Sequence, residues 1–136
     1  WWPRSRATIR SNTSGARVAP DTRASIGETG LRNWKGTFKV EWAHCDAAGI
    51  VFYPYFYMLF DQLTERFFSA NRLSYAELNR DFDAPGMPLV ETGTKYSNAS
   101  RLGDTLATES WVDLWDGKTF VVKHKLTHAD GRPALE

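Results

Sequence analysis

The sequence has a single cysteine, Cys45, so an internal disulfide framework is excluded and a reducing compartment is favoured. It has no apolar run near the roughly 20 residues that span a bilayer. It also lacks an excess of charge of either sign. Its 17 Lys and Arg against 16 Asp and Glu give a formal net charge of +1, so the balance gives no reason to expect nucleic acid or a membrane as partner. The 136 residues, 42% of them hydrophobic, have room for one core.

The first 33 residues differ in composition from the rest. They contain six Arg against two acids, for a charge of +4, whereas the remainder has 11 basic and 14 acidic residues, for −3. They are rich in Arg, Ser, Thr, Gly and Ala and show no sustained apolar period, so we interpret residues 1–33 as a disordered or non-domain segment. A transit peptide or an RNA-binding arm has a similar composition, but no amphipathic helix is evident. We favour an upstream extension or a fragment boundary.

A strand followed by an acidic loop opens the predicted domain, which begins near Trp34. Residues 38–42 alternate between large apolar and charged side chains, a pattern typical of a half-buried strand. The strand leads to Asp46, which precedes three small residues, Ala47, Ala48 and Gly49. Small residues let a backbone or a ligand approach closely, so Asp46 is a candidate catalytic carboxylate. The same acid also suits an Asx-turn or a helix cap, which is a purely local role.

A long amphipathic helix follows this loop. Pro54 suits the first helical position, and large apolar residues then recur at i, i+3, i+4, i+7 and i+11, namely Phe56, Leu59, Phe60, Leu63 and Phe67. Asp61 and Glu65 fall off this stripe, as solvated acids do. A carboxylate a few residues before a helix N-terminus sits beside unpaired N–H groups, which stabilise anions and polarise carbonyl groups. The loop and the helix start are therefore the predicted catalytic site.

The C-terminal half predicts a second helix and antiparallel strands. Residues 74–77 have the spacing of a capping box and predict a helix through Arg80. After a loop over residues 83–88, weaker alternation predicts a strand over about 89–99. Alternating faces predict strands over 105–115 and 118–127, joined by a hairpin turn at Asp116 and Gly117, and Asp130 with Gly131 starts another hairpin. One long helix and antiparallel strands predict an α+β fold with the helix packed on one face of a sheet.

The string HCDAAGIVFYPYF, followed by a helix containing Asp61 and by Gly103 and Asp104 at a strand start, resembles the 4-hydroxybenzoyl-CoA thioesterase family of the hotdog fold. The resemblance runs from about Lys35 to the C-terminus. It implies a helix wrapped by a five-stranded antiparallel sheet whose last strand lies beyond Glu136. The domain would then be a hotdog thioesterase domain over residues 34–136, truncated at its C-terminus.

The resemblance also implies an activity and its surroundings. The substrate would be an acyl-CoA thioester, hydrolysed to a free acid and CoA without a metal or redox cofactor. Proteins of this family are homodimers or homotetramers with active sites between subunits. The substrate class and the absence of targeting signals together favour a cytoplasmic location, with neither nucleic acid nor membrane as partner.

The same resemblance implies roles for five residues. The acid at the position of Asp46 attacks the thioester carbonyl carbon or activates water to do so. The backbone N–H at the helix start, here that of Tyr53, polarises the carbonyl, and Gly49 allows close approach. Asp61 matches an acid that binds the phenolic hydroxyl of an aromatic acyl group. Lys118 matches a basic position that meets the CoA phosphates.

Two other functional classes stay open. A hotdog hydratase or dehydratase also acts on acyl thioesters, although its His-bearing catalytic helix is not evident where Pro54 and Tyr55 begin the helix. A non-catalytic acyl-CoA-binding module would use Asp46 only as a cap. The acyl group is open too, because Asp116 and Gly117 stand where the aromatic-CoA enzyme has further arginines.

The histidines predict no second chemistry. His44 and Cys45 are adjacent on an extended chain, so their side chains point to opposite sides and do not form a nucleophilic pair. His124 and His128 would chelate a metal on a helix, but on a strand four residues span about 13 Å. We expect His124 to be a hydrogen-bonded histidine on the buried face.

Overall fold

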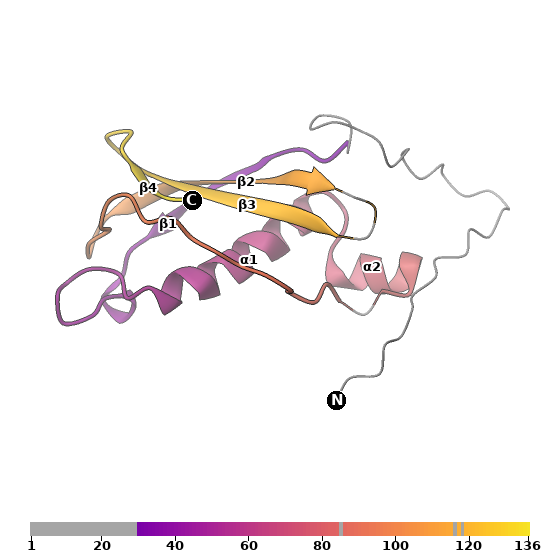
Figure 1. The fold of residues 1–136 in the computed structure, drawn as a ribbon, viewed down its shortest axis with the longest axis horizontal. Coiled ribbons are helices and arrows are strands. Elements are labelled where there is room, and N and C mark those ends of the chain that lie inside the picture. Colours follow the sequence, from indigo (N-terminus) through magenta and orange to yellow (C-terminus); the bar gives the residue numbers. More distant parts are fainter. Residues whose placement is uncertain (1–29, 85, 116, 118) are drawn as a thin grey trace, which may run out of the picture.

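The computed structural model describes residues 30–84, 86–115, 117 and 119–136 (Figure 1). Most of the predicted N-terminal segment therefore lies outside the described residues, as do Asp116 and Lys118. The elements, in chain order, are β1 (Trp34–Lys39), a single 3-10 turn η1 (Trp42–His44), α1 (Pro54–Ala70), α2 (Tyr75–Phe82), β2 (Thr105–Trp115), β3 (Phe120–His128) and β4 (Pro133–Leu135). In this part of the chain neither α-helix is long and apolar enough to cross a bilayer.

The four strands form one antiparallel sheet in the order β1-β2-β3-β4, and α1 covers one face of it (Figure 1). The register pairs Leu106 of β2 with His128 of β3, and Ser110 with His124. Since side chains two apart share a face, these four residues point to the same side of the sheet. The core lies between that side and α1, and its buried members include Val40, Val51, Phe56, Leu59, Leu63, Leu106, Leu126 and Leu135.

The apolar stripe places α1 as the sequence predicts. The helix begins at Pro54, and four of the five stripe residues are buried, while Phe60 is partly buried against the core. Burying each large apolar side chain contributes roughly 1.5–3 kcal/mol, so this stripe is the main attachment of the helix. The second predicted helix is also confirmed. Ser74 caps α2, its hydroxyl accepting from the N–H of Glu77, whose carboxylate accepts from the N–H of Ser74.

The first strand ends earlier than the alternation of residues 38–42 predicts. β1 stops at Lys39, and Trp42 lies in η1 with 81% of its surface exposed. The ring of His44 explains the difference, because its Nδ1 accepts a hydrogen bond from the N–H of Glu41 at 2.9 Å and turns the chain. Apolar alternation continues through Trp42, but the local side-chain bond ends the strand.

The strand predicted over residues 89–99 is wrong. The segment has only one isolated bridge, between Tyr96 and Leu135. Lys95 and Glu136 exchange two backbone hydrogen bonds of 2.6 and 3.1 Å, so β4 lies between β3 and this segment. The expectation that the return strand lies beyond Glu136 is therefore wrong, because β4, at residues 133–135, is a return strand paired with β3. Residues 89 and 90, in contrast, are largely exposed.

Candidate functional site

The Asp46 loop, residues 45–51, is a small hairpin that fixes one carboxylate. Cys45 pairs with Val51, and the N–H of Asp46 donates to the carbonyl of Ile50 at 3.0 Å. The N–H of Ala48 donates to Oδ1 of Asp46 at 2.8 Å, which is the Asx-turn that the sequence left open. Oδ2 has no hydrogen-bond partner among the described residues, and the side chain is exposed. One oxygen thus orients the carboxylate while the other stays available.

Gly49 closes this hairpin in a conformation that few residues adopt. Its N–H donates to the carbonyl of Asp46 at 3.0 Å, and its φ is +71°. This left-handed region costs a residue with a Cβ roughly 1–2 kcal/mol. A Cβ added at Gly49 would meet no atom within 4 Å, so the requirement for glycine is conformational.

The first turn of α1 leaves one N–H for an outside acceptor. Pro54, the first helical residue, has no N–H. The N–H groups of Tyr55 and Phe56 donate to the carbonyls of Phe52 and Tyr53, both at 3.0 Å. None of the hydrogen bonds between described residues uses the N–H of Tyr53. This N–H lies at the positive end of the helix dipole, where a developing oxyanion is stabilised.

His44 and Cys45 have local structural partners. Besides accepting from Glu41, the His44 ring lies between Phe38 and Tyr55, with ring centroids 5.0 and 5.7 Å away. The Cys45 thiol faces the carbonyl of Glu41 at 3.7 Å. These contacts anchor the hairpin to β1 and to the helix start.

Asp61 lies on the helix face that begins at the free N–H. Tyr53, Tyr57 and Asp61 follow one another at four-residue intervals, so they line one side of α1. The rings of Tyr53 and Tyr57 meet edge to face at 6.4 Å. Asp61 is exposed and lies about 12 Å along the helix axis from Tyr53. The structure therefore aligns Asp61 with the helix start but does not place it beside Asp46. Lys118 lies outside the described residues.

His124 is the hydrogen-bonded histidine that the sequence predicts. Its Nε2 is 3.1 Å from Oγ1 of Thr64, its Nδ1 is 2.8 Å from Oγ of Ser110, and its ring stacks on Phe60 at 5.6 Å. Burial lowers the pKa of His124 to about 4, so the ring is neutral at pH 7. Among the described residues, no group of three or more His, Cys, Asp or Glu is placed to hold a metal ion.

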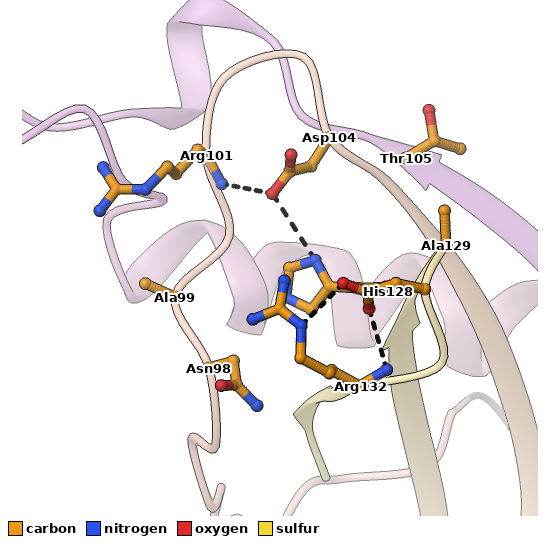
Figure 2. Close-up of a pocket in the computed structure, with 9 residues that line it drawn as sticks. Asn98, Ala99, Arg101, Asp104, Thr105, His128, Ala129 and Arg132 are labelled. Carbon is orange, nitrogen blue, oxygen red and sulfur yellow. Dashed lines mark hydrogen bonds and ion pairs between the residues drawn. The ribbon is translucent and has the colours of Figure 1, made fainter.

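A polar pocket that was not predicted from the sequence includes Arg101, which pairs with Ile50 of the Asp46 loop. A pocket of about 460 Å³ lies between residues 98–105 and the turn that joins β3 to β4 (Figure 2). Asp104, His128, Asp130 and Arg132 line it, and Arg132 is paired with Asp130 at 2.7 Å. The only sequence signal was Gly103 with Asp104 at a strand start, because its partner His128 is 24 residues away.

Comparisons with known proteins agree with this architecture. The family model of the thioesterase-like superfamily matches residues 40–136. A 4-hydroxybenzoyl-CoA thioesterase of Pseudomonas sp. (strain CBS-3) is 24% identical over 90 residues, which are 65% of this chain and 64% of that protein. The match thus spans a little under two thirds of that relative.

Solved structures show the same fold. An Asp-to-Asn variant of 4-hydroxybenzoyl-CoA thioesterase complexed with 4-hydroxybenzoyl-CoA has a TM-score of 0.70 at 22% identity, over 76% of this chain and 78% of that one. A gentisyl-coenzyme A thioesterase has a TM-score of 0.66 at 25% identity, over 75% and 80%. These likenesses confirm the predicted α+β hotdog fold.

Proposed function

Because this chain belongs to the thioesterase-like superfamily, we propose that it hydrolyses an acyl-CoA thioester to a free acid and CoA. The observation that carries the proposal is the hairpin-to-helix connection. It presents a carboxylate fixed by one oxygen, that of Asp46, and an N–H without a described partner, that of Tyr53. A thioester carbonyl set between them meets an oxygen nucleophile or base and a donor for its developing negative charge.

Asp46 can act by two routes that give the same products. As a nucleophile, its oxygen bonds to the thioester carbon and CoA thiolate leaves, which forms a mixed anhydride that water then hydrolyses. As a general base, it takes a proton from water while the water oxygen attacks the carbon, and the proton passes to the leaving sulfur. Both routes need the carbonyl oxygen near the Tyr53 N–H and a free Asp46 Oδ2, and both stay open.

The proposed acyl group is a hydroxylated aromatic ring. Tyr53, Tyr57 and Asp61 line one side of α1 from the polarising N–H onward, so an acyl ring could lie along the two tyrosines with its hydroxyl toward Asp61. Relatives in the comparisons are named for 4-hydroxybenzoyl and gentisyl groups, which are hydroxylated aromatic rings. At the other end of the substrate, Lys118 is the proposed contact to the CoA phosphates.

The proposed active form is a homodimer or a homotetramer. Leu89 is 77% exposed and Val90 84% exposed, on a segment that follows α2. Residues 86–94 take part in none of the backbone hydrogen bonds between described residues of the loops and turns, and the bonds to Glu136 begin only at Lys95. An extended apolar segment with an unpaired backbone is suited to pairing with a second copy. We place the subunit contact there.

Thiol release from a panel of acyl-CoAs tests the activity. The panel holds 4-hydroxybenzoyl-, benzoyl-, acetyl- and crotonyl-CoA, and the wild-type protein is expected to release thiol fastest from the first. Loss of the crotonyl double-bond absorbance without thiol release would instead identify a hydratase. Binding of 4-hydroxybenzoyl-CoA by calorimetry without turnover of any thioester would identify a binding module. Either of these results contradicts the thioesterase proposal.

A further inference from the structure

Asp104 joins the two backbone segments that hold the Asp46 loop. Its own N–H donates to the carbonyl of Arg101 at 3.0 Å, and its carbonyl accepts from the N–H of Val40 at 2.8 Å. The carbonyl of Val40 in turn accepts from the N–H of Gly103 at 3.0 Å. Val40 is the residue just after β1, so the turn over residues 101–104, the Asp104 turn, fixes the chain that enters the Asp46 loop.

The exit from the Asp46 loop rests on the other side of the Asp104 turn. Ile50 forms a bridge with Arg101, and the N–H of Val51 donates to the carbonyl of Ser100 at 2.9 Å. The exit arm of the Asp46 loop and Val40, five residues before the loop begins, are therefore both bonded to residues within four positions of Asp104. A shift of the Asp104 turn would therefore displace the exit arm of the Asp46 loop and the chain that leads into the loop.

The carboxylate of Asp104 holds this turn in shape. One of its oxygens, Oδ2, accepts from the N–H of Arg101 at 2.8 Å and lies 3.6 Å from Nδ1 of His128 (Figure 2). His128 is only 8% exposed, and its Nε2 has no partner among the described residues. The Asp104 carboxylate is its one ion-pair contact in this part of the chain, at a distance longer than a hydrogen bond. In Figure 2 the Arg101 guanidinium points away from the Asp104 carboxylate.

The other ion pair of the pocket, Asp130 with Arg132, orders the turn between β3 and β4, which bonds through its backbone to His128. Arg132 donates through Nε to one carboxylate oxygen of Asp130 at 2.7 Å and through its N–H to the other at 3.0 Å. Both residues belong to the exposed turn between β3 and β4, and neither has a hydrogen bond or an ion pair with a described residue of the Asp46 loop. Asp130 therefore offers a matched control, since it is an acid of the same pocket that orders a different turn.

We propose that Asp104 is a positioning residue for the reaction, acting through the N–H of Arg101 and the ring of His128 to hold the Asp46 carboxylate and the Tyr53 N–H in register. The expected effect of Asp104 on catalysis rests on the proposed function. Its expected effect on the order of the Asp46 loop does not, because that effect needs no substrate.

Amide hydrogen exchange tests the loop without any substrate. In Asp104→Ala, exchange at the N–H groups of Asp46 and Val51 is expected to rise about tenfold or more, while exchange at Leu63 and Leu126 in the core stays as in the wild type. Asp130→Ala is expected to leave all four unchanged. Unaltered exchange at Asp46 and Val51 in Asp104→Ala, or an equal rise throughout the chain, would overturn the proposal.

Kinetics test the consequence for the reaction. Misplacing a reacting group by about 1 Å can cost on the order of a hundredfold, so Asp104→Ala should lower kcat about 10- to 100-fold with KM within about threefold. Asp104→Asn should recover most of kcat, because its amide oxygen still accepts from the N–H of Arg101. A kcat within twofold of wild type in the Ala variant, or equal losses in the Asn and Ala variants, would refute the positioning role.

A failure of the proposed thioesterase function and a failure of the positioning role of Asp104 would give different results. If the wild-type protein releases thiol from no acyl-CoA, the proposed function is wrong, and the exchange experiment alone decides whether Asp104 orders the hairpin. If the wild type is active and the exchange result is as expected but Asp104→Ala keeps its kcat, the thioesterase assignment stands and the positioning role in catalysis is refuted.

Discussion

At the scale of single residues, His124 shows how burial decides the charge of a group. Its two ring nitrogens are occupied by Thr64 and Ser110, and the ring lies against Phe60 under the sheet. Neither hydroxyl partner carries a charge, so nothing offsets the cost of burying an imidazolium, and the pKa of His124 falls to about 4. The residue acts in the core, without a direct part in the proposed reaction.

This shift predicts a dependence of stability on pH. The unfolded chain binds a proton at His124 near the ordinary pKa of 6.5, whereas the folded chain does so only near 4, so folding loses free energy as the pH falls between these values. The loss is about 2 kcal/mol between pH 7 and pH 5. Urea unfolding of the wild type at the two pH values measures it. His124→Gln should flatten this part of the curve, and an equally steep curve in that variant would contradict the assignment.

Asp61 is the residue that sets the proposed preference for a hydroxylated ring. A site built to bind a hydroxyl group discriminates against the analogue that lacks it, because its own polar group is then left unpaired. The wild-type protein should prefer 4-hydroxybenzoyl-CoA to benzoyl-CoA by about tenfold or more in kcat/KM. Asp61→Leu should remove most of this preference. Glu65→Gln, one turn along the same exposed side of α1, serves as the control, and a preference unchanged in Asp61→Leu would count against the acyl group proposed here.

At the scale of elements, the unit that matters is the Asp46 hairpin joined to the start of α1. The hairpin places residue 49 in the left-handed region, where glycine is favoured, and Pro54 suits the first helical position, whose N–H would have no partner within the helix. Both preferences are met by the sequence Asp46 to Pro54 alone. This is the reason that the unit could be predicted from local patterns.

Substituting Gly49 tests the backbone requirement. Gly49→Ala should lower the free energy of unfolding by roughly 1–2 kcal/mol and also lower kcat, because the strain is relieved by moving the hairpin that carries Asp46. Gly49→Asn should lose less of both, since Asn tolerates the left-handed region. Thermal unfolding and thiol release measure the two effects. An Asn variant no better than the Ala variant would show that the side chain, and not φ, is at fault.

The elements that sequence reasoning placed correctly are those with local causes. The stripe of Phe56, Leu59, Leu63 and Phe67 has the helical period, and Ser74 with Glu77 forms a capping box, so α1 and α2 follow from a few neighbouring residues. The strand predicted after α2, over residues 89–99, was wrong for the opposite reason. Its alternation is weak, and among the described residues its backbone bonds only to residues 134–136, at the far end of the sequence.

The same distinction between local and long-range causes applies to the residues of the candidate site. Asp46, Gly49 and the Tyr53 N–H lie within eight positions and could be found by pattern. The Asp104 turn could not be linked to them, because its contacts with Val40, Ile50 and His128 depend on how the sheet folds. Long-range pairing of this kind leaves no periodic trace in a single sequence.

At the scale of the whole molecule, the fold leaves an apolar segment uncovered. The sheet and α1 bury the core, but Leu89 and Val90 stay exposed side by side in the chain. A two-fold contact between such segments covers both copies at once. The proposed homodimer or homotetramer thus uses a surface that the single chain cannot bury.

Charged substitutions in the proposed subunit contact should separate the subunits. Leu89→Glu together with Val90→Lys should shift the mass measured by light scattering from a multiple to that of one chain, because charges on an apolar contact lose their hydration when the contact forms. Glu91→Gln, at the next position, should leave the mass unchanged. A wild-type protein that runs as a monomer, or a double variant that keeps the wild-type mass, would contradict the proposed subunit contact.

The most direct test of the central claim is the rate of thiol release by Asp46→Asn on the acyl-CoA that the wild type cleaves fastest. The amide oxygen of Asn can still accept from the N–H of Ala48, so the hairpin should stay as it is while the carboxylate is lost. We expect kcat to fall about 100-fold or more, while the thermal unfolding midpoint and the circular dichroism spectrum stay as in the wild type. A folded Asn variant as active as the wild type would contradict it.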